Sequence, residues 1–176
     1  MMLLLALLAP WAMVETPTDT ASAAVARGIA AESAGDGRGM LAAARSLEAL
    51  GAKPRAGEED LAAYWRKRAL ARGVRDKAPP VRGRALGPAY SKGVLAPGAV
   101  LSTEQVFLAG QKAEVALVPQ TGRSLTIRIA AEDKQICERT TNARVKCDWV
   151  PTFTRRVQIR VANQGSAAAV YYLVSN

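Results

Sequence analysis

The sequence contains no histidine, and this absence removes the side chain used most often as a general base and as a metal ligand. Only two of the 176 residues are cysteine, which is too few for a four-ligand zinc site. Phosphate-binding loops, dinucleotide fingerprints and G-x-S-x-G nucleophile motifs are also missing. The remaining catalytic candidates are Ser91 beside Lys92 and scattered acids such as Glu104, and nothing pairs them. We therefore expect a protein that is not an enzyme and uses no cofactor.

Long apolar segments are scarce as well. Residues 1–14 form an uncharged, leucine-rich run that is shorter than the ~20 residues a membrane-spanning helix needs. Ala21 and Ala23 then fit the A-x-A pattern of a signal peptidase site. We predict a signal peptide over residues 1–23, cleavage after Ala23, a periplasmic or secreted location, and no transmembrane helix in the mature chain. The run lacks a preceding Lys or Arg, so a misassigned start or a short core helix remains the alternative.

The two cysteines agree with export. Cys137 and Cys147 lie in a strand-rich region, and in an oxidising compartment such a pair is usually a structural disulfide. In the cytosol the same pair would be two buried thiols. A redox-active pair is disfavoured because the C-x-x-C spacing is absent.

Composition divides the remaining chain into three parts. Residues 24–75 are rich in alanine and poor in β-branched residues, which is typical of helices. Residues 76–100 are rich in Pro and Gly, which indicates a linker. Residues 101–176 are rich in Val, Ile and Thr, which favours strands.

Periodicity and turn signals predict the individual elements. Apolar spacing and Gly breaks favour helices over residues 20–33, 38–50 and 58–72. Strict alternation, as in Leu125, Ile127 and Ile129, favours strands that bury one face. The expected strands cover residues 104–108, 113–118, 124–130, 135–138, 144–149, 155–162 and 168–174. The predicted fold is α+β, with short N-terminal helices followed by a C-terminal antiparallel β-sandwich of jelly-roll type.

The order of the sequence motifs in the C-terminal half resembles that of a known family. After Cys137 come Cys147, a W-x-P motif at Trp149, a strand ending V-x-N-x-G at Val161, and a closing Y-x-L-x-S-N at Tyr171. In this order, over roughly residues 95–176, the chain resembles bacterial pre-peptidase C-terminal domains. The resemblance implies a non-catalytic jelly-roll β-sandwich of exported proteins that often accompanies secreted proteases. Some relatives bind collagen-like or polysaccharide ligands.

The chain departs from this family at one place. Relatives often carry an Asp-rich, calcium-binding stretch where this chain has residues 121–126, including Arg123. Calcium needs several carboxylate or carbonyl oxygens, and the adjacent Glu132 and Asp133 also suit a solvated turn. We expect no metal.

The formal net charge of +9 favours an anionic partner. In an exported protein that partner would be an envelope protein or an anionic glycan or lipid, with no nucleic acid. The basic residues that we predict to form such a surface are Arg66, Lys67, Arg68, Arg128, Arg155, Arg156 and Arg160. Solvated helix and strand faces would explain the same residues. Two other functions stay open: a minor secreted hydrolase with a Ser or carboxylate site, and a cytoplasmic nucleic-acid binder if the signal is false.

Overall fold

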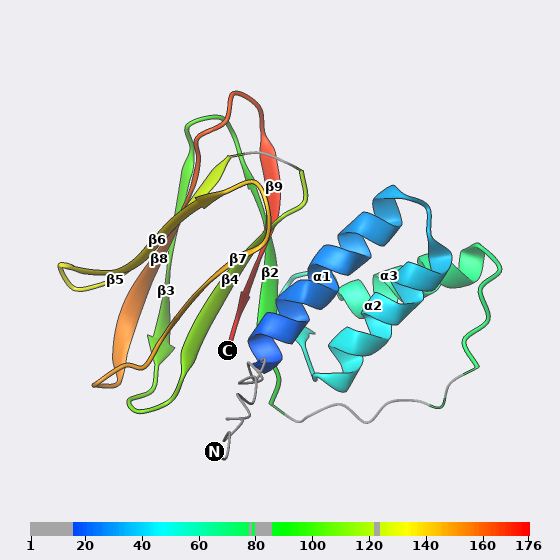
Figure 1. Cartoon of the computed structure of the whole chain (residues 1–176), viewed down its shortest axis with the longest axis horizontal. Coiled ribbons are helices and arrows are strands. Elements are labelled where there is room, and N and C mark those ends of the chain that lie inside the picture. The colour runs from blue at the N-terminus through cyan, green and yellow to red at the C-terminus, as the bar shows by residue number, and fades with distance from the viewer. Residues whose placement is uncertain (1–15, 78, 80–85, 122–123) are drawn as a thin grey trace, which may run out of the picture.

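A computed structural model of the chain describes residues 16–77, 79, 86–121 and 124–176. Three helices lie beside two stacked sheets (Figure 1). The helices are α1 (Pro17–Ser33), α2 (Gly37–Ala49) and α3 (Leu61–Ala71). The strands are β1 (Lys53–Pro54), β2 (Ala89–Leu95), β3 (Val100–Phe107), β4 (Ala113–Pro119), β5 (Leu125–Ala131), β6 (Lys134–Thr141), β7 (Val145–Trp149), β8 (Arg155–Asn163) and β9 (Ala169–Ser175). The α+β prediction is confirmed at this level.

Aspartate caps set where two of the helices begin. The Asp36 carboxylate accepts from the backbone N–H groups of Arg38 and Gly39, each at 3.0 Å, so α2 starts at Gly37. Asp60 caps α3 in the same way. The prediction that α3 begins at Glu58 is therefore wrong, because a carboxylate at the N-cap position accepts the first unpaired N–H groups of the helix.

The strands form two sheets with the orders β1-β2-β9-β4-β7 and β3-β8-β5-β6. Every pair is antiparallel except β1 with β2. Alternating residues of β5 and β8, such as Ile127 and Ile159, are fully buried between the sheets. The alternation of these sequences thus places one face in the core and the other in solvent.

Strand β2 corrects the predicted linker over residues 76–100. It pairs along its whole length with β9, from Ala89 opposite Ser175 to Leu95 opposite Ala169. Gly93 contributed to the linker interpretation, but it lies against Tyr171: a Cβ at position 93 would stand 2.2 Å from Tyr171 Cζ. The glycine serves close packing inside a strand, and the sandwich begins before residue 101.

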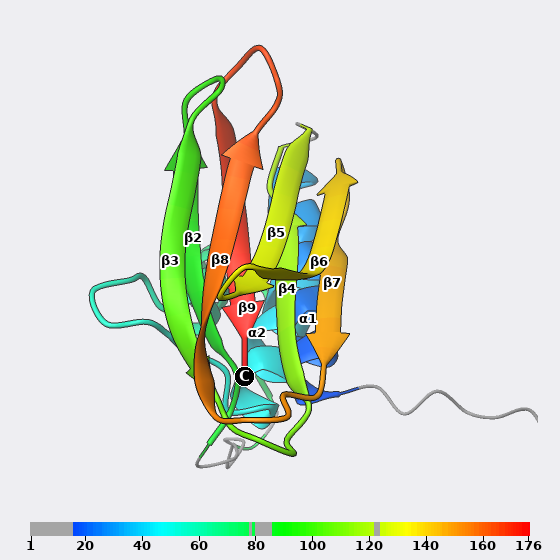
Figure 2. The same ribbon diagram turned by 90° about the vertical axis from the view of Figure 1, so that its left-hand side faces the viewer.

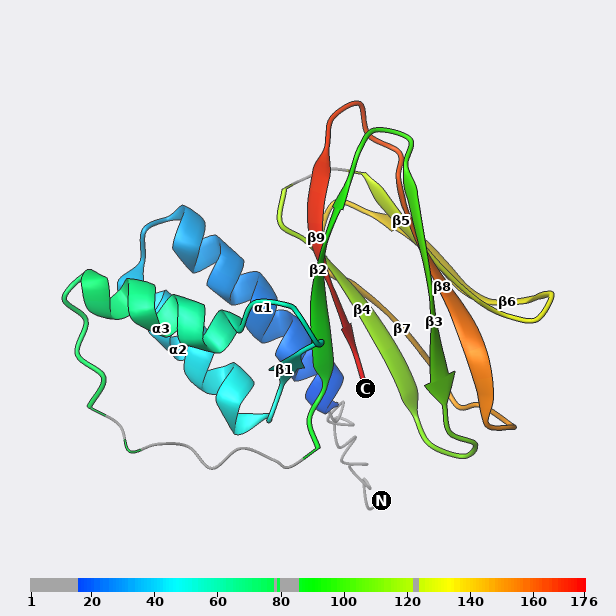
Figure 3. The same ribbon diagram turned by 180° about the vertical axis from the view of Figure 1, so that it is seen from behind.

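The helices cover the outer face of the β1-β2-β9-β4-β7 sheet (Figure 3). One core fills the space between the two sheets, and a second joins the helices to this sheet. The second core includes Trp65 and Met40 from the helices and Val118 and Val174 from the strands. Strand β4 is consequently buried on both faces from Ala113 to Val118. The helical region therefore packs on the sandwich.

The first turns of α1 belong to this second core. Thr18, Ala21, Ser22 and Ala24 are each at most 1% exposed. The predicted cleavage point after Ala23 lies inside α1, and residues 1–15 of the predicted signal peptide lie outside the described residues. Within the described part of the chain, no helix has the length and apolar character to cross a membrane.

Candidate anion-binding site

The predicted basic run on α3 consists mostly of ion-paired side chains. The Arg66 guanidinium binds both Glu48 carboxylate oxygens, and its Nε lies 3.1 Å from an oxygen of Asp76. Arg68 lies 3.4 Å from a Glu32 oxygen. Only Lys67 of this run has no carboxylate partner among the described residues. Arg66 and Arg68 therefore tie helices and the following loop together rather than offering free positive charge.

The predicted arginines of the sandwich lie on the β3-β8-β5-β6 sheet, away from α3 (Figure 1). Arg128 and Arg160 are directly opposite each other on β5 and β8. Arg128 is 3.6 Å from Glu138, Arg155 is 3.7 Å from Glu132, and Arg156 is 3.4 Å from Glu104. Arg160 alone of these four has no ion pair within the described chain. The seven predicted residues therefore do not form one surface, and nearby acids balance most of their charge.

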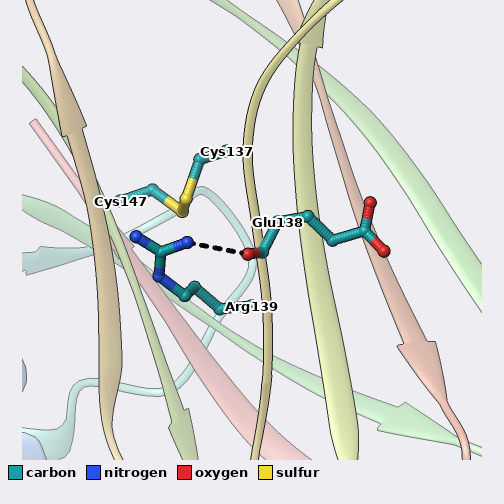
Figure 4. The surroundings of a disulfide bond; sticks show 4 residues. All are labelled: Cys137, Glu138, Arg139 and Cys147. Carbon is teal, nitrogen blue, oxygen red and sulfur yellow. Dashed lines mark hydrogen bonds between the residues drawn. A yellow bond between two sulfur atoms is a disulfide. The ribbon is translucent and has the colours of Figure 1, made fainter.

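The predicted cysteine pair is a disulfide in the structure. Cys137 of β6 and Cys147 of β7 are bonded, with their Cα atoms 6.1 Å apart. Figure 4 shows the bond between the two strands, with the Arg139 guanidinium on the same side and the Glu138 carboxylate pointing away. Arg139 Nη1 donates to the Glu138 carbonyl oxygen at 3.0 Å. Because β6 and β7 are edge strands of different sheets, this bond joins the two sheets at one margin of the sandwich.

A basic hollow that the sequence analysis missed lies between α2 and the segment after α3. Its volume is about 810 Å³. Five cationic side chains line it, together with Leu41, Ala42, Gly73 and Val74. The five cations are Arg38, Arg45, Arg72, Arg75 and Lys77, and we call this site the basic hollow.

The turn at the end of α3 builds the basic hollow. Gly73 N–H donates to the Leu70 carbonyl at 2.9 Å, and Val74 N–H donates to the Ala69 carbonyl at 3.2 Å. These bonds end the helix and reverse the chain. Arg75 and Lys77 are thereby brought back toward Arg38 on the first turn of α2.

The Asp76 carboxylate forms ion pairs beside the basic hollow. It binds Arg45 as well as Arg66, and the hydrogen bond from Arg45 is the main reason that the pKa of Asp76 lies below its usual value. Arg38, Arg75 and Lys77 have no ion pair in the part of the chain that the structure describes, and Arg72 donates only to the Arg68 carbonyl, at 3.5 Å. Uncompensated positive charge therefore gathers here.

The lining of the basic hollow suits the binding of anionic groups. Guanidinium groups present planar pairs of donors that match phosphate and carboxylate oxygens. Among the described residues, the lining contains no hydroxyl, thiol or carboxylate side chain that would act as nucleophile or base. Ser91 and Glu104, the catalytic candidates from the sequence, lie on β2 and β3, outside this lining, and Glu104 is paired with Arg156.

The sequence did carry one signal for this site. Arg72, Arg75 and Lys77 lie within six residues of each other, but we divided them between a helix end and a linker. Arg38 and Arg45 are far away in the sequence and reach the hollow only through the packing of α2 on α3.

No family model matches the sequence, and no curated protein matches it either. Among solved structures, the pre-peptidase C-terminal domain of collagenase from Bacillus anthracis is similar, as the C-terminal motifs predicted. The TM-score is 0.44, the identity is 10%, and the match covers 49% of this chain and 87% of that chain. PliG, a periplasmic inhibitor of g-type lysozyme from Aeromonas hydrophila, is similar over 51% of this chain and 84% of its own, with a TM-score of 0.40 and 11% identity. The mitogen of Yersinia pseudotuberculosis is similar over 51% of this chain and 85% of its own, with a TM-score of 0.39 and 12% identity.

Proposed function

We propose that the chain is an exported, non-catalytic binding module of the cell envelope that recognises an anionic polysaccharide, lipid or protein. The observation that carries this proposal is the basic hollow, where Arg38, Arg72, Arg75 and Lys77 meet without a carboxylate partner in the described chain. Its size suits several anionic groups of one ligand rather than a single small ion.

Two features support export. The leucine-rich run over residues 1–14 has the composition of a signal peptide core. The disulfide between Cys137 and Cys147 belongs to an oxidising compartment. The intact mass of the protein from its own cells tests export, since a mass that lacks an N-terminal segment is expected. A full-length mass with two free thiols would contradict it.

The strand order also supports the finer fold assignment. Eight strands arranged as β2-β9-β4-β7 facing β3-β8-β5-β6 suit a jelly roll: consecutive strands alternate between the sheets, except that β5 and β6 pair as neighbours in one sheet.

Titration of the protein into heparin and into phosphatidylglycerol vesicles tests the binding function. The double variant Arg72→Glu/Arg75→Glu changes only exposed side chains of the basic hollow. We expect it to bind more than about tenfold more weakly, because hydrogen bonds to charged groups contribute roughly 1.5–3 kcal/mol each. The matched control is Arg27→Glu/Lys67→Glu, which makes the same charge change at exposed helix positions outside the hollow.

The control separates local recognition from net charge. If both double variants lose affinity equally, binding follows overall charge and the hollow is not the site. Tighter binding to a DNA duplex than to either probe, with a steep salt dependence, would instead favour the nucleic-acid function.

A further inference from the structure

Strand β3 is the open edge of the sandwich. Figure 2 shows it at the margin of the front sheet, and it pairs only with β8 among the described strands. The other edges are each occupied in part. The first half of the β2 edge is covered by β1, which pairs with Ala89 and Tyr90, and by Glu58, whose carboxylate accepts from Lys92 N–H. Strands β6 and β7 are joined by the disulfide.

This edge lacks the usual protection against pairing with another strand. Solvated edge strands commonly carry Lys, Pro or a bulge. Residues 100–107 contain no Lys, Arg, Pro or Gly, and they pair with β8 in continuous register. Val100 is 48% exposed, Leu101 41% and Val106 52%. Four of the eight residues are apolar, Glu104 is the one charged residue, and Arg55 donates to the Gln105 side chain. The β3 backbone has no strand partner on this side among the described residues, and an edge of this length is suited to accept a strand.

We propose that β3 of a second copy of this chain occupies this edge, in antiparallel pairing with Thr103 at the two-fold axis. Opposed residues of antiparallel strands point to the same side of a sheet, so their numbers must have the same parity. A centre at Thr103 sets Val100 of each copy opposite Val106 of the other and Ser102 opposite Glu104. The two-fold symmetry therefore produces two Val100–Val106 contacts, one at each end of the paired strands. A centre at Glu104 would instead place two carboxylates opposite each other, which is destabilising.

Charge complementarity supports the same register. Arg160 on β8 lies opposite Ser102 of β3 and has no ion pair within the described chain. In the proposed dimer, Glu104 of the second copy follows next across the joined sheets, about 10 Å from Arg160 between Cα atoms. This Glu104 also lies 3.4 Å from Arg156 of its own chain, and the two oxygens of one carboxylate can accept from both guanidinium groups. Arg and Glu side chains span that distance over a small serine. Two such pairs form by symmetry and partner the arginine that is otherwise unpaired.

The assembly closes at two copies. Both β3 edges are used in one isologous contact, so the four-stranded sheets join into one eight-stranded sheet. The interface uses neither α2 nor the segment after α3, and the dimer is therefore independent of the anion-binding function.

Sedimentation velocity of the disulfide-bonded protein over a range of concentrations tests the dimer. We expect the mass to double as concentration rises. Val106→Lys places a charge at the pairing edge and is expected to give monomer at every concentration. The control Val94→Lys changes a residue that is 65% exposed on β2, outside the interface, and is expected to leave the dimer intact. Thermal melting of both variants checks that they fold.

A cysteine at the two-fold axis tests the register directly. Thr103→Cys brings two thiols opposite each other, with Cα atoms about 4.5–5.5 Å apart, which suits a disulfide. Mild oxidation is expected to give a covalent dimer on a non-reducing gel. Val106→Cys is the control, because its two copies would lie about 20 Å apart along the strands. A wild type that stays monomeric throughout, or equal cross-linking of the two variants, would overturn the proposal.

Discussion

Trp65 of α3 packs directly on Gly28 of α1. A Cβ at position 28 would stand 2.3 Å from Cη2 and Cζ3 of the Trp65 ring, which is far inside contact distance. The indole is fully buried, and its Nε1 donates to the Glu32 carboxylate of α1 at 3.1 Å. The ring therefore cannot move away without losing this part-buried hydrogen bond, and the pair sets how closely α1 and α3 approach.

The contact predicts that Gly28→Ala destabilises the protein. At an open helix position this change would stabilise, because alanine is the better helix former by about 1 kcal/mol. Here overpacking reverses the sign, and we expect a loss of roughly 1–3 kcal/mol in the free energy of unfolding. Urea denaturation measures it. Arg27→Ala, at an exposed position of the same helix, is the control and should be nearly neutral. An equal or higher stability for Gly28→Ala would contradict the close contact.

Loss of the disulfide is expected to weaken the sandwich without unfolding it. The bond between Cys137 and Cys147 closes a short loop, for which chain entropy predicts about 2–3 kcal/mol. The double variant Cys137→Ser/Cys147→Ser and the reduced wild type should lose the same stability in urea. Reductant should have no effect on the double variant. A reductant effect on that variant would show that the loss does not come from this bond.

Much of the fold follows from the sequence because its signals are local. All seven predicted strands are present, since alternation such as Val157, Ile159 and Val161 reports directly which face is buried. The observed ends differ by a few residues; β3, for example, begins at Val100 rather than at residue 104. Helix ends shift where a cap decides them, as at Asp60.

The features that the sequence analysis did not predict depend on tertiary contacts. Strand β2 escaped prediction because Gly93 breaks its pattern, and only the ring of Tyr171 explains that glycine. The basic surface for an anionic partner was assigned from clusters in the sequence, whereas Arg66 and Arg68 pair with carboxylates on other elements. The basic hollow is lined by basic side chains from two segments that are distant in the sequence. A local sequence pattern does not indicate that these segments lie together in the fold.

Alkaline pH is expected to destabilise the protein through its tyrosines. Burial raises the pKa of Tyr171 and of Tyr172 to about 12 and raises that of Tyr90 further. Hydrogen bonding to the Glu32 carboxylate raises the pKa of Tyr64, the fourth tyrosine of the chain. A tyrosine in the unfolded chain ionises near pH 10. The unfolded state thus releases protons first, so stability is complete below pH 10 and falls as pH rises from 10 to 12.

Tyrosinate absorbance near 295 nm checks this expectation. In urea, the four tyrosines should titrate together near pH 10. In the folded protein the absorbance should stay low at that pH and appear with the loss of structure. Titration near pH 10 with the near-ultraviolet circular dichroism unchanged would contradict the buried placement.

Removing the first turns of α1 is expected to destabilise the whole molecule. Ala21 and Ser22 are fully buried, and Ser22 Oγ accepts from Arg144 Nη1 of the sandwich at 3.1 Å. A chain beginning at Ala24 loses this bond and the buried surface of two helical turns. We expect it to be less stable than a chain beginning at Thr16 by at least about 2 kcal/mol. Ser22→Ala in the longer chain removes the bond to Arg144 and should account for about 1 kcal/mol of the difference. Equal melting temperatures for the two chains would contradict this contribution and would mean that cleavage after Ala23 leaves the fold intact.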